Sequence, residues 1–102
     1  MEVEFLSDRT LMWATGELDL LTAPRLSGEI TAHLLDGAVG LAILDLQDLA
    51  FIGCRGVAVL IDSAERARER GVELRIVPGR ALRLMDRHLG LRDLIRMADD
   101  RP

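Results

Sequence analysis

The spacing of hydrophobic residues over the first third of the chain predicts a β-hairpin followed by a helix. Apolar side chains alternate with polar or small ones over residues 3–5 and 11–13, on either side of a polar break at 7–9, which is the period of paired strands. From 22 to 36 they recur every three or four residues, as on one face of a helix. Thr22 suits the N-cap position, so we expect the helix to begin there.

The rest of the chain predicts two further strands and two further helices. Residues 41–46 (LAILDL) are almost continuously apolar, which is typical of a strand buried on both faces, and 72–78 (VELRIVP) follow strand alternation. Helical spacing returns over 54–70 and 80–89, whereas 91–97 fit both a short turn and a strand. The order β-β-α-β-α-β-α predicts a small α/β sandwich, a mixed sheet with helices packed mainly on one face.

The helical periodicity also predicts which side chains are buried. In the helix over 54–70 the expected buried stripe is Val57, Leu60, Ile61 and Ala64. Ser63 is expected near the outer face of the same helix. In the helix over 80–89 we expect burial of Leu82, Met85 and Leu89.

Length and composition predict one cytoplasmic domain. The chain has 102 residues, against roughly 150 for a typical domain, so we expect a single domain over 1–102. Hydrophobic residues make up 49% of the chain, yet no apolar run approaches the length of a membrane span, so no membrane insertion is expected. The first residues carry Glu2 and Glu4 instead of the basic and apolar regions of a secretory signal. The one cysteine, Cys54, excludes an intramolecular disulfide.

The charge balance argues against nucleic acid as a partner. The formal net charge is −4, and aromatic residues are 3% of the chain, which leaves little for phosphate contacts or base stacking. The 13 basic residues are all arginines. No lysine is therefore available for Schiff-base chemistry or for a Walker phosphate loop.

Two loops that lead from a predicted strand into a predicted helix are the candidate binding site, because ligands of open α/β sheets bind at such turns. The first loop spans 16–22 and the second spans 47–56. The candidate binding residues are Glu17, Asp19 and Thr22 in the first loop, and Gln47, Asp48, Gly53, Cys54, Arg55 and Gly56 in the second.

These loops hold no recognisable catalytic set, and no enzyme activity is expected. The chain has no G-x-S-x-G elbow and no G-x-G-x-x-G loop. His33 and His88 each lie on a predicted helix without a second ligand at metal spacing, so we expect solvated or capping histidines. We therefore expect no cofactor and no metal.

Three blocks in order and spacing carry a resemblance to a known family. They are GELDLLTAPRL (16–26), LAILDLQDLAFIGCRGVAVLIDSAERARERG (41–71) and VELRIVPGRALRLMDRHLGL (72–91). Together they resemble the STAS domain of bacterial anti-sigma-factor antagonists, over about residues 1–97. The middle block is the most specific of the three, because a buried strand, a loop and a helix after a small-residue turn follow one another in it.

The resemblance implies a protein–protein switch. An antagonist of this family binds an anti-sigma factor, usually a serine kinase of the histidine-kinase-like ATPase fold, and so releases a sigma factor for transcription. The kinase ends binding by phosphorylating a Ser or Thr in a D-S-S-G-like turn at the start of the second long helix. A phosphate of nearly −2 charge placed in an interface repels acidic neighbours and must be desolvated.

The present sequence departs from that turn. Gly53, Cys54, Arg55 and Gly56 stand in the places of D, S, S and G. The phosphoacceptor position is therefore occupied by Arg55, whose guanidinium cannot accept a phosphoryl group in this chemistry. We expect no phosphoacceptor in the turn and the loss of phosphorylation switching there. Phosphorylation at another residue stays open.

Several alternatives stay open. Arg55 fits constitutive binding of an anti-sigma kinase by pairing with a carboxylate on it. It also fits a divergent STAS module in another assembly, such as a lipid-transport ABC complex or a signalling scaffold, and a module that sequesters an unknown partner. A small nucleotide- or lipid-binding domain and a homodimer are further alternatives.

Three candidate residues also have a second interpretation. Asp19 belongs either to the partner surface or only to the turn before the helix. Thr22 is an N-cap or a modification site. Cys54 is a small buried residue, or a thiolate favoured by the helix N-terminus and Arg55, which oxidation would make negative.

Overall fold

A mixed six-stranded β-sheet forms the centre of the molecule. The computed structural model describes residues 1–5, 10–37 and 40–98, so the predicted break at 7–9 lies outside the described residues. The strand order is β1-β2-β3-β5-β6, and β4 pairs with β2 off this path. The β1–β2 pair is antiparallel and the other pairs are parallel. The strands are β1 (Glu2–Phe5), β2 (Leu11–Leu18), β3 (Leu41–Asp45), β4 (Leu49–Ile52), β5 (Glu73–Val77) and β6 (Arg96–Met97).

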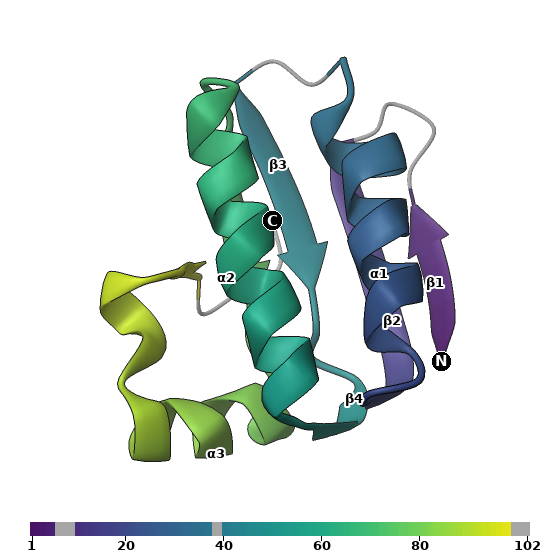
Figure 1. The fold of residues 1–102 in the computed structure, drawn as a ribbon, viewed down its shortest axis with the longest axis vertical. Helices are drawn as coiled ribbons and strands as arrows, with labels where there is room; N and C mark the ends of the chain where they lie inside the picture. The colour runs from purple at the N-terminus through teal and green to yellow at the C-terminus, as the bar shows by residue number, and fades with distance from the viewer. Residues whose placement is uncertain (6–9, 38–39, 99–102) are drawn as a thin grey trace.

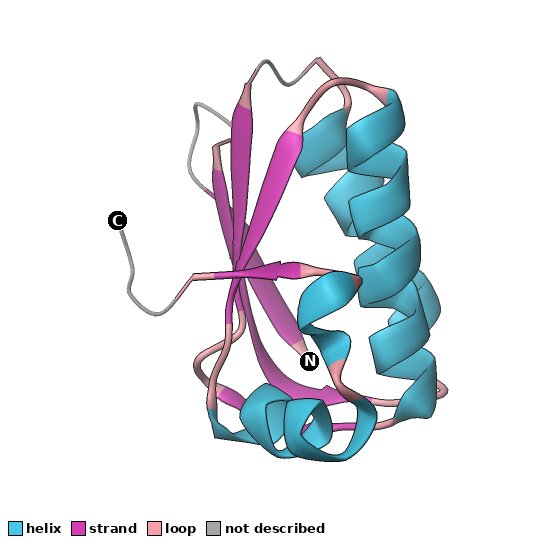
Figure 2. Ribbon diagram, turned by 90° about the vertical axis from the view of Figure 1, so that its left-hand side faces the viewer, coloured by secondary structure: helices cyan, strands magenta, loops and turns pink. Residues whose placement is uncertain are grey.

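The two long helical segments lie on one side of this sheet. Figure 1 shows α1 and α2 side by side in front of the strands, with α3 at the lower end, and in Figure 2 no helix of the described residues covers the opposite face. This arrangement confirms the predicted mixed sheet with helices mainly on one face. The helices are α1 (Ala23–Glu29), its continuation η1 (Ile30–Leu35), α2 (Cys54–Glu69), α3 (Arg80–Leu89) and the short η2 (Leu91–Asp93).

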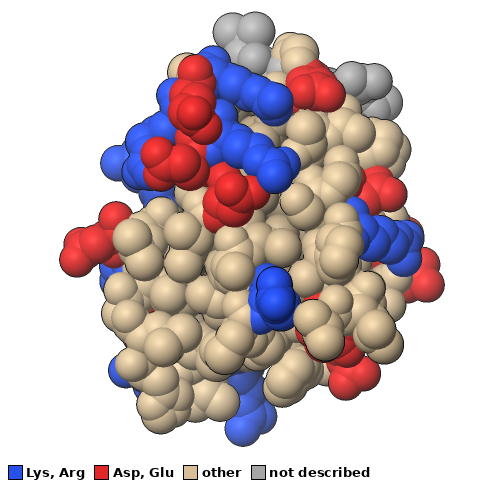
Figure 3. Space-filling model, viewed as in Figure 1, with Lys and Arg blue, Asp and Glu red and all other residues tan. Residues whose placement is uncertain are grey.

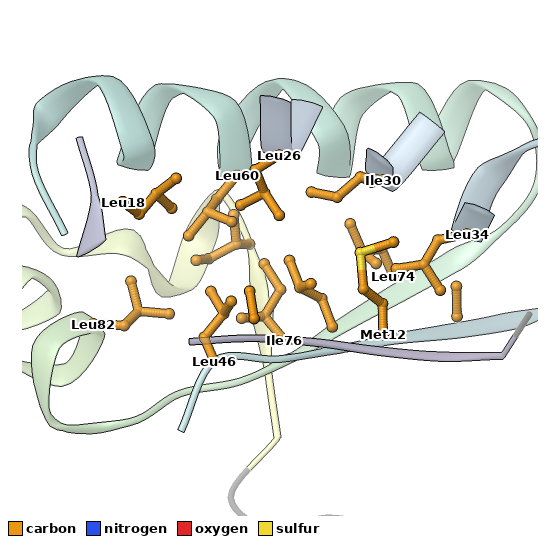
Figure 4. Packing of buried hydrophobic residues seen from close by; sticks show 14 of the residues in the cluster. Met12, Leu18, Leu26, Ile30, Leu34, Leu46, Leu60, Leu74, Ile76 and Leu82 are labelled. Carbon is orange, nitrogen blue, oxygen red and sulfur yellow. The ribbon is translucent and has the colours of Figure 1, made fainter. Parts of the chain in front are cut away.

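The core fills the space between the sheet and the two long helical segments. Leu26, Ile30 and Leu34 are fully buried, as their helical spacing predicts. They face Met12 and Ile76 and their neighbours from the strands (Figure 4). Burial of each large aliphatic side chain is worth about 1.5–3 kcal/mol, so this layer supplies most of the driving force for folding.

The first helix differs from its prediction in its second half. It begins as an α-helix with Pro24 in the first turn, but residues Ile30–Leu35 form a π-helix. The Asp36 N–H donates to the Thr31 carbonyl at 2.8 Å, five residues back, in place of the usual four. The wider turn still keeps Leu34 on the buried face, so the hydrophobic stripe is unbroken.

β4 was not predicted from the sequence, because residues 47–56 were expected to form a loop. The strand has no alternating burial: Leu49 and Ile52 are buried while Ala50 and Phe51 are exposed. In the structure β4 pairs with the last residues of β2, after a register shift between Gly16 and Glu17. β2 therefore pairs with β3 along its first half and with β4 along its second half.

The predicted exposure of Ser63 and the predicted burial of Leu89 are both wrong. Ser63 is 1% exposed and not on the outer face, because the buried stripe of α2 runs through Leu60, Ser63 and Ala67 while Ile61 and Ala64 lie at its edge. Leu89 is 53% exposed. It is the last residue of α3, and Gly90 at φ +64° ends the helix there.

Candidate functional site

The two predicted site loops lie beside each other at the carboxyl ends of β2 and β4. Register places Leu18 of β2 opposite Ile52 of β4. Directly beyond this pair, the Gly53 N–H donates to the Leu18 carbonyl at 2.9 Å. The turn before α1 and the turn before α2 are therefore joined through the backbone, although 33 residues separate Thr22 from Arg55.

Gly56 lets α2 begin close against β2. A Cβ on Gly56 would lie 2.6 Å from the Leu18 Cγ and 2.9 Å from the Ile52 Cγ1. Only a residue without a side chain therefore permits this approach. Gly56 is buried, so its contribution to the site is the placement of the helix start and not a contact with a partner.

Asp19 organises the turn before α1. Its Oδ1 accepts the N–H groups of Leu21 and Thr22, each at 3.0 Å. The Asp19 N–H in turn donates to the Thr22 Oγ1 at 2.9 Å. That hydroxyl donates to the Glu17 carbonyl at 2.8 Å, with the Asp19 Oδ1 also 3.1 Å away.

This network corrects the predicted role of Thr22. Thr22 occupies the N-cap position of α1, but its side chain makes no capping bond to the helix. The Thr22 hydroxyl instead closes the turn back to the end of β2. The aspartate three residues earlier supplies the acceptor, which fits the preference of Asp side chains for N–H groups two and three residues ahead.

The same hydrogen bonds shift the acidity of Asp19. The Thr22 N–H, helped by the Thr22 hydroxyl and the Leu21 N–H, holds the pKa of the Asp19 carboxyl below its ordinary value, against the opposing effect of burial. Asp19 is therefore a carboxylate at neutral pH, in a turn that is already ordered before any partner arrives.

The start of α2 presents two exposed side chains. Gly53 precedes the helix in an extended conformation, and no side chain caps the first turn. Cys54 is an exposed free thiol, which contradicts its interpretation as a small buried residue. Arg55 is exposed, and the described part of the structure gives it no ion pair and no hydrogen-bond partner. Arg55 is therefore an unpaired cation within the described part of the structure.

A shallow groove runs from Arg55 between α1 and α2. Its volume is about 280 Å³. It is lined by Leu20, Ala23, Pro24, Ser27, Arg55, Ala58, Val59 and Asp62. The carboxylate of Asp62 already pairs with Arg66 at 2.8 Å.

Exposed apolar side chains surround this end of the molecule. Leu20 is 64% exposed, Leu21 86% and Phe51 50%. Figure 3 shows that charged side chains gather over the C-terminal half of α2, whereas fewer of them lie toward the end near β4. Leu20 and Leu21 are neighbours in the chain, and exposed apolar patches are typical of protein-binding faces. These residues were not among the predicted site residues, although the hydrophobic pair Leu20-Leu21 in a strand-to-helix loop was a signal for them.

A larger cleft of about 630 Å³ lies at the far edge of the sheet, between α2, β5 and β6. Its three arginines, Arg68, Arg92 and Arg96, each form an ion pair with a nearby carboxylate. This cleft therefore offers no unpaired cationic group and lies apart from the predicted site residues.

The described ranges contain no cluster of three His, Cys, Asp or Glu residues able to hold a metal ion. His33 stacks on Phe5 with ring centroids 4.1 Å apart, and its Nε2 lies 3.0 Å from Glu29. Within the same ranges, no helix has both the length and the apolar character needed to cross a membrane.

Comparison with known proteins gives a consistent result. The family model of the STAS domain matches residues 1–101. The anti-sigma-F factor antagonist RsfA of Mycobacterium tuberculosis is 51% identical over 35 residues, a match that covers 34% of this chain and 27% of that protein. The matched segment thus spans about a quarter of that relative's length.

Two solved structures share the fold. The crystal structure of an anti-sigma factor antagonist from Mycobacterium paratuberculosis is 27% identical, with 97% of this chain and 84% of that chain covered and a TM-score of 0.74. The anti-sigma factor antagonist SpoIIAA in its unphosphorylated form is 18% identical, with 98% and 88% covered and a TM-score of 0.70. At that identity the second likeness concerns the fold alone.

Proposed function

The chain belongs to the STAS domain family, and from that premise we propose that it is an anti-sigma-factor antagonist, which binds an anti-sigma factor and so releases a sigma factor for transcription. The observation that carries this proposal is the likeness to a solved antagonist at 27% identity over 97% of the chain. The turn that Asp19 orders and the exposed apolar side chains of Leu20, Leu21 and Phe51 support a binding role.

The partner would bind across the ends of β2 and β4. Glu17, Asp19 and Thr22 form the ordered turn on one side, and Gly53–Gly56 form the helix start on the other. Cys54 and Arg55 reach outward from that start, while Gly56 holds it against Leu18. A rigid turn lowers the entropic cost of binding, because fewer groups must be ordered in the complex.

Asp19 has two functions in this proposal. Its Oδ1 is used by the turn, and the described structure gives its Oδ2 no hydrogen bond. Oδ1 therefore stabilises the loop, while Oδ2 can accept a hydrogen bond from the partner. This division joins the two interpretations of Asp19, turn former and partner contact, in one side chain.

The family resemblance suggests the class of partner. We propose that the anti-sigma factor is a serine kinase of the histidine-kinase-like ATPase fold. Arg55 occupies the acceptor position and presents no hydroxyl, so binding would persist in the presence of ATP instead of ending by phosphorylation of this turn. Regulation would then act on the amount of the antagonist or at another residue.

A binding assay with paired variants tests the proposal. Each purified anti-sigma factor of the source organism is titrated against the wild type, Asp19→Asn and Asp19→Arg. We expect one of them to bind the wild type and to release its sigma factor in a transcription assay. Asp19→Asn retains an oxygen for the turn, so it should fold normally and bind more weakly, and Asp19→Arg should abolish binding. Failure of every anti-sigma factor to bind the wild type would refute the proposed function.

A further inference from the structure

We infer that the groove between α1 and α2 receives an acidic, aliphatic segment of the anti-sigma factor, with one aliphatic side chain in the groove and one carboxylate paired with Arg55. This inference rests on the proposed function and deepens it. It adds a second contact region, along the α1–α2 face, to the turns at the ends of β2 and β4.

The size and lining of the groove favour a side chain as its occupant. The groove of about 280 Å³ is open and lies below the roughly 300–1,000 Å³ of pockets that enclose small molecules. Its walls are mostly aliphatic, from Leu20, Pro24 and Val59. Leu20 alone is 64% exposed, so an aliphatic side chain placed there would remove apolar surface of both partners from water.

The lining of α2 is continuous along one helical face. Ala58 and Val59 lie three and four residues after Arg55, and Asp62 lies four and three residues after them. Arg55 lies in the first turn of this 16-residue helix, and Asp62 lies two turns later. The groove therefore has a basic end near β4 and an acidic end further up the helix.

The charges at these two ends are not equivalent. Asp62 is neutralised by Arg66 at 2.8 Å, and Arg66 is held in turn by the Thr31 hydroxyl at 2.8 Å. Arg55 has no partner among the described residues. The unsatisfied charge of the groove is thus positive, so a carboxylate complements it and a basic side chain does not.

The position of Arg55 fixes where that carboxylate must lie. The positive end of the α2 dipole adds to the guanidinium at the first turn, whereas the groove offers no unpaired cation further along, because Arg66 is already paired with Asp62. The acidic residue of the partner therefore lies at the β4 end, and the aliphatic residue lies over Val59. A guanidinium can hold a carboxylate by two parallel hydrogen bonds, which gives the pair a defined geometry.

Two variants and a matched control test this inference against the anti-sigma factor that binds the wild type. Arg55→Glu reverses the charge at the groove. Ala58→Gln places a larger polar side chain in the groove at an exposed helix position that tolerates substitution. Arg87→Glu makes the same charge change at an exposed residue of α3, outside the groove. We expect Arg55→Glu and Ala58→Gln each to weaken binding at least about tenfold and Arg87→Glu to leave it unchanged.

A charge exchange identifies the carboxylate. Each exposed Asp or Glu of the anti-sigma factor is replaced by Arg and tested against Arg55→Glu, and we expect one such replacement to restore binding. Unchanged binding of Arg55→Glu, unchanged binding of Ala58→Gln, or no restoring replacement overturns the inference and leaves the proposed function standing. If no anti-sigma factor binds the wild type, the proposed function and this inference both fail. Thermal unfolding of every variant separates loss of binding from loss of fold.

Discussion

Gly56 at the start of α2 lies so close to Leu18 at the end of β2 that a Cβ on the glycine would be 2.6 Å from the leucine Cγ. This contact sets the distance between the helix and the sheet at the proposed binding surface. It also explains why a glycine follows Arg55 in a buried helical position, where the residue otherwise weakens the helix.

We predict that Gly56→Ala destabilises the protein by about 1–3 kcal/mol, because the added methyl must displace Leu18 or tilt α2. Urea unfolding measures the change. Gly28→Ala is the matched control: Gly28 lies in α1 with nothing within 4 Å of an added Cβ. That substitution should stabilise the protein by about 0.5–1 kcal/mol. Equal effects of the two substitutions would contradict the close approach at Leu18.

The turn before α1 should weaken in acid. The hydrogen bonds from Thr22 and Leu21 lower the pKa of Asp19 in the folded state, so the carboxylate is favoured by folding. Its contribution to stability is fully present above the pKa of the unfolded chain and is lost as the pH falls through the folded pKa.

The measurement is a carboxyl-carbon NMR titration of the native protein. We expect the Asp19 midpoint to lie below the ordinary value of an aspartate. The Thr22 and Leu21 amide signals should move with the same midpoint, since these amides donate to Oδ1. A midpoint for Asp19 above the ordinary value, or amides that do not respond, would contradict this account of the turn.

Cys54 should report occupancy of the proposed surface. It is the one cysteine of the chain and is exposed at the start of α2. We predict complete labelling of the native protein by a maleimide, detected by mass as a single adduct. Addition of the bound anti-sigma factor should slow labelling at least about tenfold. Unchanged labelling in the complex would place the partner elsewhere, and Cys54→Ser gives the unlabelled baseline.

The sequence predicted most of the fold because its elements follow simple periods. Leu26, Ile30 and Leu34 recur at helical spacing, and the apolar run over 41–46 predicted a buried strand. β4 was not predicted, because only Leu49 and Ile52 of its residues are buried. Its pairing with β2 also depends on a register shift between Gly16 and Glu17, which are distant from β4 in the sequence. Pairing between strands that are distant in the sequence produces no periodic pattern of hydrophobic residues within either strand.

The candidate site was likewise predicted only in part. The two loops, with Asp19 and Arg55, were predicted from their place between strand and helix. The hydrogen-bond network of Thr22 was not predicted, because an N-cap and a turn-closing hydroxyl have the same sequence signal. The groove was not predicted, because residues of two helices line it and the sequence of one helix does not determine the distance to the other.

The proposed loss of phosphorylation should be reversible by substitution. Cys54 and Arg55 leave the turn without a hydroxyl, and Gly53 leaves it without an acidic residue. We predict that Gly53→Asp combined with Arg55→Ser restores a D-S-S-G-like acceptor, D-C-S-G in sequence. The backbone tolerates the change, because Gly53 is extended and a Cβ there would touch the Phe51 ring at 3.4 Å.

With the partner kinase and ATP, the double variant should gain one phosphate at position 55, and the wild type none in residues 53–56, as read by peptide mass spectrometry. The added charge of nearly −2 should then weaken binding to the kinase. Gly53→Asp combined with Arg55→Ala is the control, because it carries the same acidic residue and no hydroxyl. A double variant that binds the kinase and gains no phosphate would mean that Arg55 is not what disables the switch. In that case the bound kinase itself lacks activity toward this turn.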